Sequence, residues 1–178
     1  MEKKGKWTIK KVRTVFKSHF IKLTESDVIT PKNKPGKYIS LKIRDGVAIL
    51  PIDRNGYVYL VDEFSFVLNK RLITAPKGAI EDGEEPITAA KRELKEEVGF
   101  EAGEWKYLGE IKRLPNIMNC SAHLFLAKKL KKGNLNLDED EDIKMIKIKF
   151  EEAYKMVLES KIVEDSSCAV ILKAKEFF

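Results

Sequence analysis

The chain has 178 residues, 43% of them hydrophobic, and 34 basic against 28 acidic residues give it a net charge of +6; this length predicts one compact unit with a small appendage. No apolar run approaches the roughly 18 residues of a membrane-spanning helix, and residues 1–7 lack the apolar stretch of a signal peptide, so we expect a cytoplasmic protein without a membrane partner. The basic charge favours phosphate-bearing ligands, but its scatter along the chain indicates a solvated surface rather than a nucleic-acid-binding face.

Strands are predicted first along the chain. Residues 8–24 mix β-branched, aromatic and basic residues, and the pattern stops before Pro35 and Gly36. Proline and glycine interrupt strands and mark loops. We therefore predict an N-terminal strand region over residues 1–36 and a main domain over residues 37–178.

In the main domain, β-branched, aromatic and long aliphatic residues recur at the short spacing of strands. The predicted strands cover residues 38–43, 47–52, 57–64, 105–112, 122–130 and 143–150. The second and third flank Asn55-Gly56, which supplies the positive φ of a tight turn, so we expect them to pair as an antiparallel hairpin. Helical patterns cover Pro86–Val98, residues 151–160 and residues 166–176. This order predicts an α/β (α+β) fold, with a mixed β-sheet sandwiched between helices.

The helix Pro86–Val98 carries a crowded group of acids. It begins with proline, which suits an opening turn, and ends before Gly99, which suits the left-handed residue after a helix. An apolar stripe at helical spacing predicts the face that packs on the sheet, formed by Ile87, Ala90, Leu94 and Val98. Glu93, Glu96 and Glu97 lie on the flank of that stripe. Such crowding is unfavourable unless a cation joins the carboxylates.

A hard divalent metal resolves this repulsion, because Mg²⁺ prefers oxygen ligands and usually combines a few carboxylates with substrate phosphate oxygens. Arg92 can pair with Glu96 or with an acid of the preceding loop, and so orient a ligand. The alternative is an ordinary solvated face whose neighbouring lysines form salt bridges. The preceding loop favours the metal site, since Gly78 and Gly83 let the backbone approach a ligand and Glu84 adds an acid.

Loop and helix together resemble the Nudix box. Five residues separate Gly78 from Glu84, and seven more precede the run Arg-Glu-Leu-Lys-Glu-Glu-Val-Gly-Phe that begins at Arg92. Phe100 departs from the aliphatic residue usual in the family, at a packing position. The resemblance implies a Nudix fold and the Mg²⁺-dependent hydrolysis of a nucleoside diphosphate linked to another moiety, with Mn²⁺ as a substitute metal.

The resemblance also implies roles for single residues. The metal ligands would be Glu93, Glu96 and Glu97. Arg92 and Glu96 would take part in catalysis, and Arg92 with Glu84 would support the loop. Lys77 and Gly78 would contact the substrate, and the backbone carbonyl of one of them would join the metal.

Outside the box, the chain is similar to the ADP-ribose pyrophosphatase and nucleoside diphosphate sugar hydrolase branch. One basis is the N-terminal strand region, which in that branch helps to form a homodimer. The other is the acidic run at residues 138–142, where the branch places a catalytic base and a further metal ligand. These functions would fall on Glu139 and Glu141, with Glu141 also as the ligand. The alternative is a solvated turn.

Where many ADP-ribose enzymes carry glutamine-x-arginine, this chain has Asp62-Glu63-Phe64, and an arginine first follows at Arg71. We predict Phe64 and Arg71 as substrate contacts, with a place in the core as the alternative for Phe64. The leading hypothesis is hydrolysis of ADP-ribose or a related nucleoside diphosphate sugar to a nucleoside monophosphate and a sugar phosphate. The alternatives are an RNA 5′-end or nucleoside triphosphate pyrophosphohydrolase and a non-catalytic nucleotide-sensing module.

Overall fold

The computed structural model describes residues 2–133 and 142–178. The chain divides into two compact units. The first comprises Met1–Arg44 and Lys112–Ser121, and the second comprises Asp45–Ile111 and Ala122–Phe178. None of the helices in the described ranges is long and apolar enough to cross a membrane.

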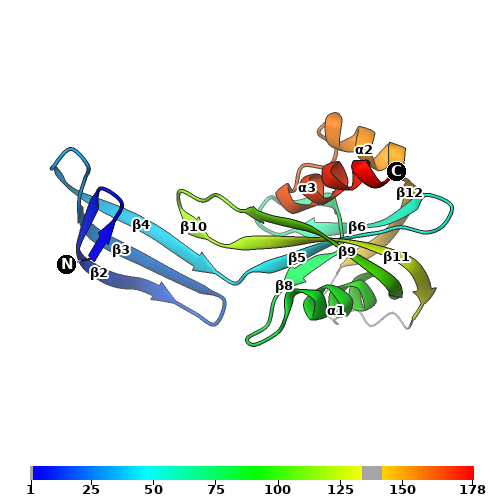
Figure 1. The fold of residues 1–178 in the computed structure, drawn as a ribbon, viewed down its shortest axis with the longest axis horizontal. Coiled ribbons are helices and arrows are strands. Elements are labelled where there is room, and N and C mark those ends of the chain that lie inside the picture. Colours follow the sequence, from blue (N-terminus) through cyan, green and yellow to red (C-terminus); the bar gives the residue numbers. More distant parts are fainter. Residues whose placement is uncertain (1, 134–141) are drawn as a thin grey trace. The chain divides into compact units, whose positions relative to one another are not determined.

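The first unit is a sheet with the strand order β1-β2-β3-β4-β10 (Figure 1). Its strands are β1 Glu2–Lys4, β2 Trp7–Lys17, β3 Ile21–Ile29, β4 Pro35–Ile43 and β10 Met118–Asn119. Residues 8–24, predicted as strand, divide between β2 and β3 around a turn in which the Ser18 hydroxyl accepts hydrogen bonds from the amides of Phe20 and Ile21. β4 is antiparallel to β3 along its whole length, and β10 runs parallel to β4.

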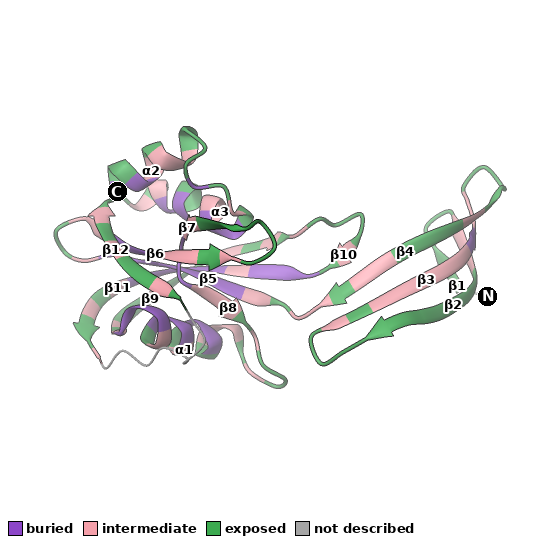
Figure 2. Ribbon diagram, turned by 180° about the vertical axis from the view of Figure 1, so that it is seen from behind, coloured by how far each residue is buried: buried purple, intermediate pink, exposed green. Residues whose placement is uncertain are grey.

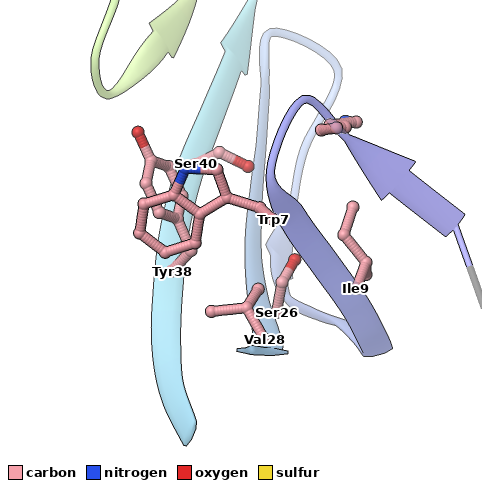
Figure 3. Close-up of a pocket in the computed structure, with 7 residues that line it drawn as sticks. Trp7, Ile9, Ser26, Val28, Tyr38 and Ser40 are labelled. Atoms are coloured by element: carbon pink, nitrogen blue, oxygen red, sulfur yellow. The ribbon is translucent and has the colours of Figure 1, made fainter. Parts of the chain in front are cut away.

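A cavity of about 260 Å³ lies on this first sheet (Figure 3). Its lining residues are Lys4, Trp7, Ile9, Ser26, Val28, Tyr38 and Ser40. The rings of Trp7 and Tyr38 meet edge to face, with their centroids 5.7 Å apart. Since no acidic side chain is among the lining residues, the cavity offers no carboxylate to a divalent metal.

The second unit contains two sheets in its described part, with the orders β8-β5-β11-β9 and β12-β6-β7. Their strands are β5 Gly46–Pro51, β6 Tyr57–Ser65, β7 Lys70–Thr74, β8 Lys77–Ala79, β9 Phe100–Lys112, β11 Ser121–Lys132 and β12 Ile143–Lys149. β5 is parallel to β11 and antiparallel to β8, whereas β6 is antiparallel to β7 and β12. The strand directions are therefore mixed, as predicted.

The predicted hairpin between residues 47–52 and 57–64 is wrong. The turn forms, with Gly56 at φ 76°, but β5 and β6 lie in different sheets, joined by an isolated bridge between Ile52 and Val58. Val47 and the other β5 residues up to Pro51 are buried, so the backbone groups on both edges of the strand need partners. β8 and β11 supply them, although neither follows β5 directly in the chain.

The sequence patterns do not predict strands β7 and β8. β8 consists of Lys77, Gly78 and Ala79, residue types that rarely form strands on their own. It exists because it pairs with β5, with Val47 opposite Gly78, and because the Ile80 amide donates to the Asp45 carbonyl at 2.8 Å. This pairing holds the loop that leads into the first helix against the sheet.

Helices lie on both sides of these sheets, with α1 on one side and α2 and α3 on the other (Figure 1). They are α1 Pro86–Val98, α2 Phe150–Leu158 and α3 Asp165–Ala174, followed by a short 3-10 turn, Lys175–Phe177. Alternate β5 side chains serve two core clusters, since Val47 and Ile49 pack with α1 whereas Ala48 and Leu50 pack with the opposite cluster. Figure 2 colours most of β5 as buried. The predicted sheet between helices is confirmed.

Helix α1 forms as its sequence predicts. Pro86 occupies its first turn, and Gly99 ends it in the left-handed conformation at φ 67°, with its amide donating to the Lys95 carbonyl at 3.0 Å. Leu94 and Val98 of the apolar stripe are buried against the sheet. The acids on the flank of this stripe are thereby brought to the edge of the sheet where β8 lies.

Candidate active site

Gly78 of β8 lies directly against the Glu93 carboxylate of α1. A Cβ at position 78 would collide with both oxygens of that carboxylate. Glycine lets this side chain of the helix pack directly on the backbone, and a residue with a Cβ would displace the Glu93 carboxylate. The first position of the box is therefore fixed by close approach between loop and helix.

Arg92 joins the loop before α1 to the helix through hydrogen bonds. Its Nε and Nη2 atoms donate to the two carboxylate oxygens of Glu84 at 3.2 and 3.1 Å, and Nη2 also donates to the Ala79 carbonyl at 2.9 Å. Nη1 donates to Glu93 at 2.7 Å and to Glu96 at 3.1 Å. Hydrogen bonding between Arg92 and Glu84 raises the pKa of Arg92 and lowers the pKa of Glu84. The pairing of Arg92 with a loop acid and with Glu96, suggested by the sequence, is present.

Glu93 and Glu97 are buried, with 9% and 5% of their surface exposed. Glu97 accepts a hydrogen bond from the Lys77 amide at 3.1 Å. Burial raises the pKa of Glu97 to about 8, and the charge of Glu93 adds to this rise, whereas the charge of Lys77 opposes it. A carboxylate in this environment gains from a nearby cation, because the cation offsets the loss of hydration of its charged form.

The side chains fit a divalent cation by their chemistry. Glu93, Glu96 and Glu97 offer oxygen donors along one edge of one helix, as Mg²⁺ prefers. Within residues 2–133 and 142–178, however, no three His, Cys, Asp or Glu side chains are gathered closely enough to hold a metal as they stand. The Nη1 group of Arg92 binds Glu93 and Glu96 instead, so a bound cation would share carboxylates that Arg92 now neutralises.

Glu63 is a further acid of this site, although no sequence pattern predicts a role for it. Its carboxylate forms an ion pair with the Lys77 ammonium and accepts a hydrogen bond from the Thr74 hydroxyl at 3.2 Å. The sequence carried only part of the signal: alternation along a strand puts Glu63 on the same face as Val61, two positions earlier. The structure adds that Val61 packs on α1. Lys77 thus contacts two acids. Its backbone amide binds Glu97 of the box, and its side chain pairs with Glu63.

Phe64 and Arg71 face each other across β6 and β7, and Phe64 is 47% exposed. Arg71 donates to Asp62 at 2.7 Å through Nε, and its Nη1 donates to Asp142 at 2.5 Å. These contacts do not join Phe64 or Arg71 to the carboxylates of α1. Glu139 and Glu141 lie outside the described residues.

The start of α3 supports the segment before the box. The Ala75 amide, two residues before Lys77, donates to the buried Ser167 hydroxyl at 2.9 Å. Ser167 in turn donates from its hydroxyl and its amide to Glu164, the N-cap of α3, at 2.6 and 2.7 Å. Burial by itself raises the pKa of Glu164, but the hydrogen bonds that its carboxylate accepts from Ser167 and Ser166 outweigh burial and lower the pKa to about 2.

We expect Glu164→Gln to destabilise the protein by about 1 kcal/mol at pH 7, because a neutral amide oxygen accepts the hydrogen bonds from Ser167 more weakly than a carboxylate does. Because the pKa of Glu164 is lowered from an ordinary 4.5 to about 2, its contribution is complete above pH 4.5 and is lost as the pH falls toward 2. Thermal melts of both proteins between pH 7 and pH 3 test this, with Glu152→Gln on the exposed face of α2 as the control. A difference in melting temperature between wild type and Glu164→Gln that stays constant down to pH 3 would contradict this expectation.

Comparisons with known proteins identify the family of this chain. A model of the NUDIX domain family matches residues 42–166. The chain is 32% identical to the ADP-ribose pyrophosphatase of Bacillus subtilis (strain 168), covering 89% of this chain and 86% of that protein. It is 28% identical to the methanol dehydrogenase activator of Bacillus methanolicus, covering 90% and 88%.

A solved crystal structure of an ADP compounds hydrolase superposes with a TM-score of 0.87 at 24% sequence identity, covering 99% of this chain and 96% of that one. This likeness concerns the fold, which is the predicted Nudix fold. The family match covers the whole segment from Gly78 to Phe100 that carries the box. The chain belongs to the NUDIX domain family and is a Nudix hydrolase similar to the ADP-ribose pyrophosphatases.

Proposed function

We propose that the protein hydrolyses the diphosphate bond of ADP-ribose or a related nucleoside diphosphate sugar with Mg²⁺, or with Mn²⁺ as a substitute. The observation that carries this proposal is the packing of Glu93 on Gly78 beside the buried Glu97, which places carboxylates where a loop backbone can receive a ligand. The relative from B. subtilis supports the substrate class, since it is named an ADP-ribose pyrophosphatase. Both metals prefer oxygen ligands.

In the reaction, the oxygen of water bonds to one phosphorus while the bond from that phosphorus to the bridging oxygen breaks. The bridging oxygen leaves with the second phosphate, and the products are a nucleoside monophosphate and a sugar phosphate. Mg²⁺ held by the carboxylates of α1 would neutralise charge on the diphosphate. Arg92 orients Glu93 and Glu96 from its anchor on Glu84. Lys77 and Gly78 receive the phosphate side of the substrate.

The water must lose a proton, and we propose Glu139 or Glu141 as its acceptor, with Glu141 also as a metal ligand. Support comes from Asp142, whose side chain and carbonyl accept hydrogen bonds from Arg71. Arg71 thereby holds one end of the acidic run beside β7. Glu139→Gln or Glu141→Gln is expected to lower kcat about 10²-fold with folding intact. Near-normal rates in both variants would reject the acidic run as catalytic.

We also propose Phe64 and Arg71 as substrate contacts at the end of the β6–β7 pair. An aromatic ring that is half exposed, as Phe64 is, can stack on a nucleotide base. Arg71 would meet a phosphate or a sugar hydroxyl while it holds Asp142.

For the whole protein we propose a cytoplasmic homodimer formed through residues 1–36. Val12, Val15 and Phe16 of β2 are each more than half exposed, and neighbouring exposed apolar side chains mark interaction surfaces. Sedimentation equilibrium at micromolar concentration tests the dimer. The mass of a single chain throughout would contradict it.

One experiment tests the function. The purified protein is incubated with Mg²⁺ and a panel of ADP-ribose, nucleotide sugars, dinucleoside polyphosphates, nucleoside triphosphates and capped RNA, and the products are identified. We expect AMP and ribose 5-phosphate from ADP-ribose, and no turnover with EDTA. Preferential turnover of triphosphates or capped RNA would favour the alternative pyrophosphohydrolases, and no turnover of any compound would leave a non-catalytic sensing module.

Gly78→Ala is expected to lower kcat for ADP-ribose about 10²-fold without unfolding the protein. The added methyl group displaces the Glu93 carboxylate, and a displacement of about 1 Å in a catalytic group costs about 10²-fold. Initial rates and a thermal melt measure the two effects. Gly103→Ala in β9 is the control, because a Cβ there meets its nearest atom at an ordinary 3.4 Å. Wild-type rates in Gly78→Ala would refute the role of this close approach.

A further inference from the structure

Glu63 stands outside the box yet faces the same site. Side chains alternate along β6, and Val61 packs in the core cluster of α1, so Glu63 points to the α1 side of the sheet. Ile143, its partner on β12, packs against the same cluster. The Glu63 side chain is 24% exposed, so it lies at the rim of the site, within reach of solvent and of a ligand.

Glu63 neutralises the one lysine that the box loop places there. The Lys77 ammonium pairs with the Glu63 carboxylate and lies 3.4 Å from the Thr74 hydroxyl, which itself donates to Glu63. The Lys77 amide is bonded to Glu97, so the backbone of this lysine is fixed on a proposed metal ligand. The charges of Lys77 and Glu63 both act on Glu97, in opposite directions. Lys77, Glu63 and Glu97 therefore form one cluster of interacting charges.

The charges of this cluster are unequal. The acids are Glu63, Glu84, Glu93, Glu96 and Glu97. Lys77 forms an ion pair with Glu63, and Arg92 forms ion pairs with Glu84, Glu93 and Glu96. Glu97 accepts a hydrogen bond from the Lys77 backbone amide. Arg92 is bound to three of these acids on the helix and its loop. The charge of Lys77 acts on Glu97, so a substrate phosphate that approaches Glu97 would also be attracted by Lys77. The ion pair with Glu63 reduces that attraction.

We propose that Glu63 is a specificity-determining residue that favours diphosphates esterified at both ends over nucleotides with a free terminal phosphate. This inference rests on the proposed function. ADP-ribose carries one negative charge on each of its two phosphates, whereas the terminal phosphate of ATP adds charge to the chain. A carboxylate at the rim repels the added charge, and a lysine already paired with that carboxylate does not offset it.

The test compares kcat/KM for ADP-ribose and for ATP in wild type and in Glu63→Gln. We expect the ratio of ADP-ribose to ATP to fall about tenfold in Glu63→Gln, because removal of the carboxylate frees Lys77 for the extra phosphate. Glu63→Asp keeps the charge and is expected to keep the wild-type preference. Glu152→Gln removes an equal charge from an exposed position on α2 and is expected to leave both constants unchanged.

Binding supplies a readout that needs neither metal nor turnover. Isothermal titration of the same proteins with ADP-ribose and with ATP in EDTA should show the same shift in the ratio of the two Kd values. An unchanged ratio in folded Glu63→Gln, or an equal shift in Glu63→Asp, overturns the inference. If no protein turns over any substrate, the proposed function fails, and the Kd ratio still decides whether Glu63 selects by charge.

Discussion

Glu97→Gln is expected to lower kcat for ADP-ribose on the order of 10³-fold, because a metal ligand that stabilises transition-state charge contributes several kcal/mol. Glutamine keeps the shape of the side chain and still accepts the hydrogen bond from the Lys77 amide, which Glu97 holds at 3.1 Å. It removes the charge that burial disfavours. Initial rates at saturating Mg²⁺ measure the loss, and a thermal melt in EDTA should show a stability no lower than that of the wild type.

Glu152→Gln is the matched control for this substitution. It makes the same chemical change on the exposed face of α2, and we expect wild-type rates and melting. If Glu97→Gln retained more than a tenth of the wild-type rate, Glu97 would not be a metal ligand.

Arg92→Ala is expected to have the largest effect on stability. It removes all the bonds by which Arg92 holds Glu84, Glu93, Glu96 and the Ala79 carbonyl. Breaking a buried ion pair costs about 3–5 kcal/mol, and because the Arg92 side chain is 28% exposed, solvent screening reduces our expectation to about 2–3 kcal/mol. This corresponds to a melting temperature lower by about 5–10 °C.

Arg92→Lys separates charge from geometry. Lysine keeps the positive charge but lacks the planar fork that reaches Glu84 and the helix acids at once. We expect it to recover less than half of the lost melting temperature. If Arg92→Lys and the wild type had the same melting temperature, positive charge alone would be sufficient at this position. The planar geometry of the guanidinium group would then not contribute to stability.

Helix α1 and the box could be read from the sequence because their determinants are local. Pro86 and Gly99 mark the ends of the helix, and Leu94 and Val98 repeat at helical spacing, so neither feature depends on distant strands. The pairing of Arg92 with Glu96 follows from the same periodicity, since residues four apart on a helix are neighbours.

The pairing of the strands could not be read in this way. The Asn-Gly turn before Tyr57 predicts a hairpin, and the turn is present at Gly56, yet β5 pairs with β8 and β11. A strand that is buried on both faces must satisfy both of its edges, and the partners come from segments far along the chain. No local pattern records which segments these are.

By itself, the sequence determined the Nudix family of this protein, the crowded acids of α1 and the loop glycines that accompany them. Only the tertiary structure decided that Glu63 joins this site through its ion pair with Lys77. β6 and β8 lie in different sheets, and the two residues meet because both sheets pack on the same face of α1. An ion pair between separate strands depends on packing, and packing is a property of the whole fold rather than of any one segment.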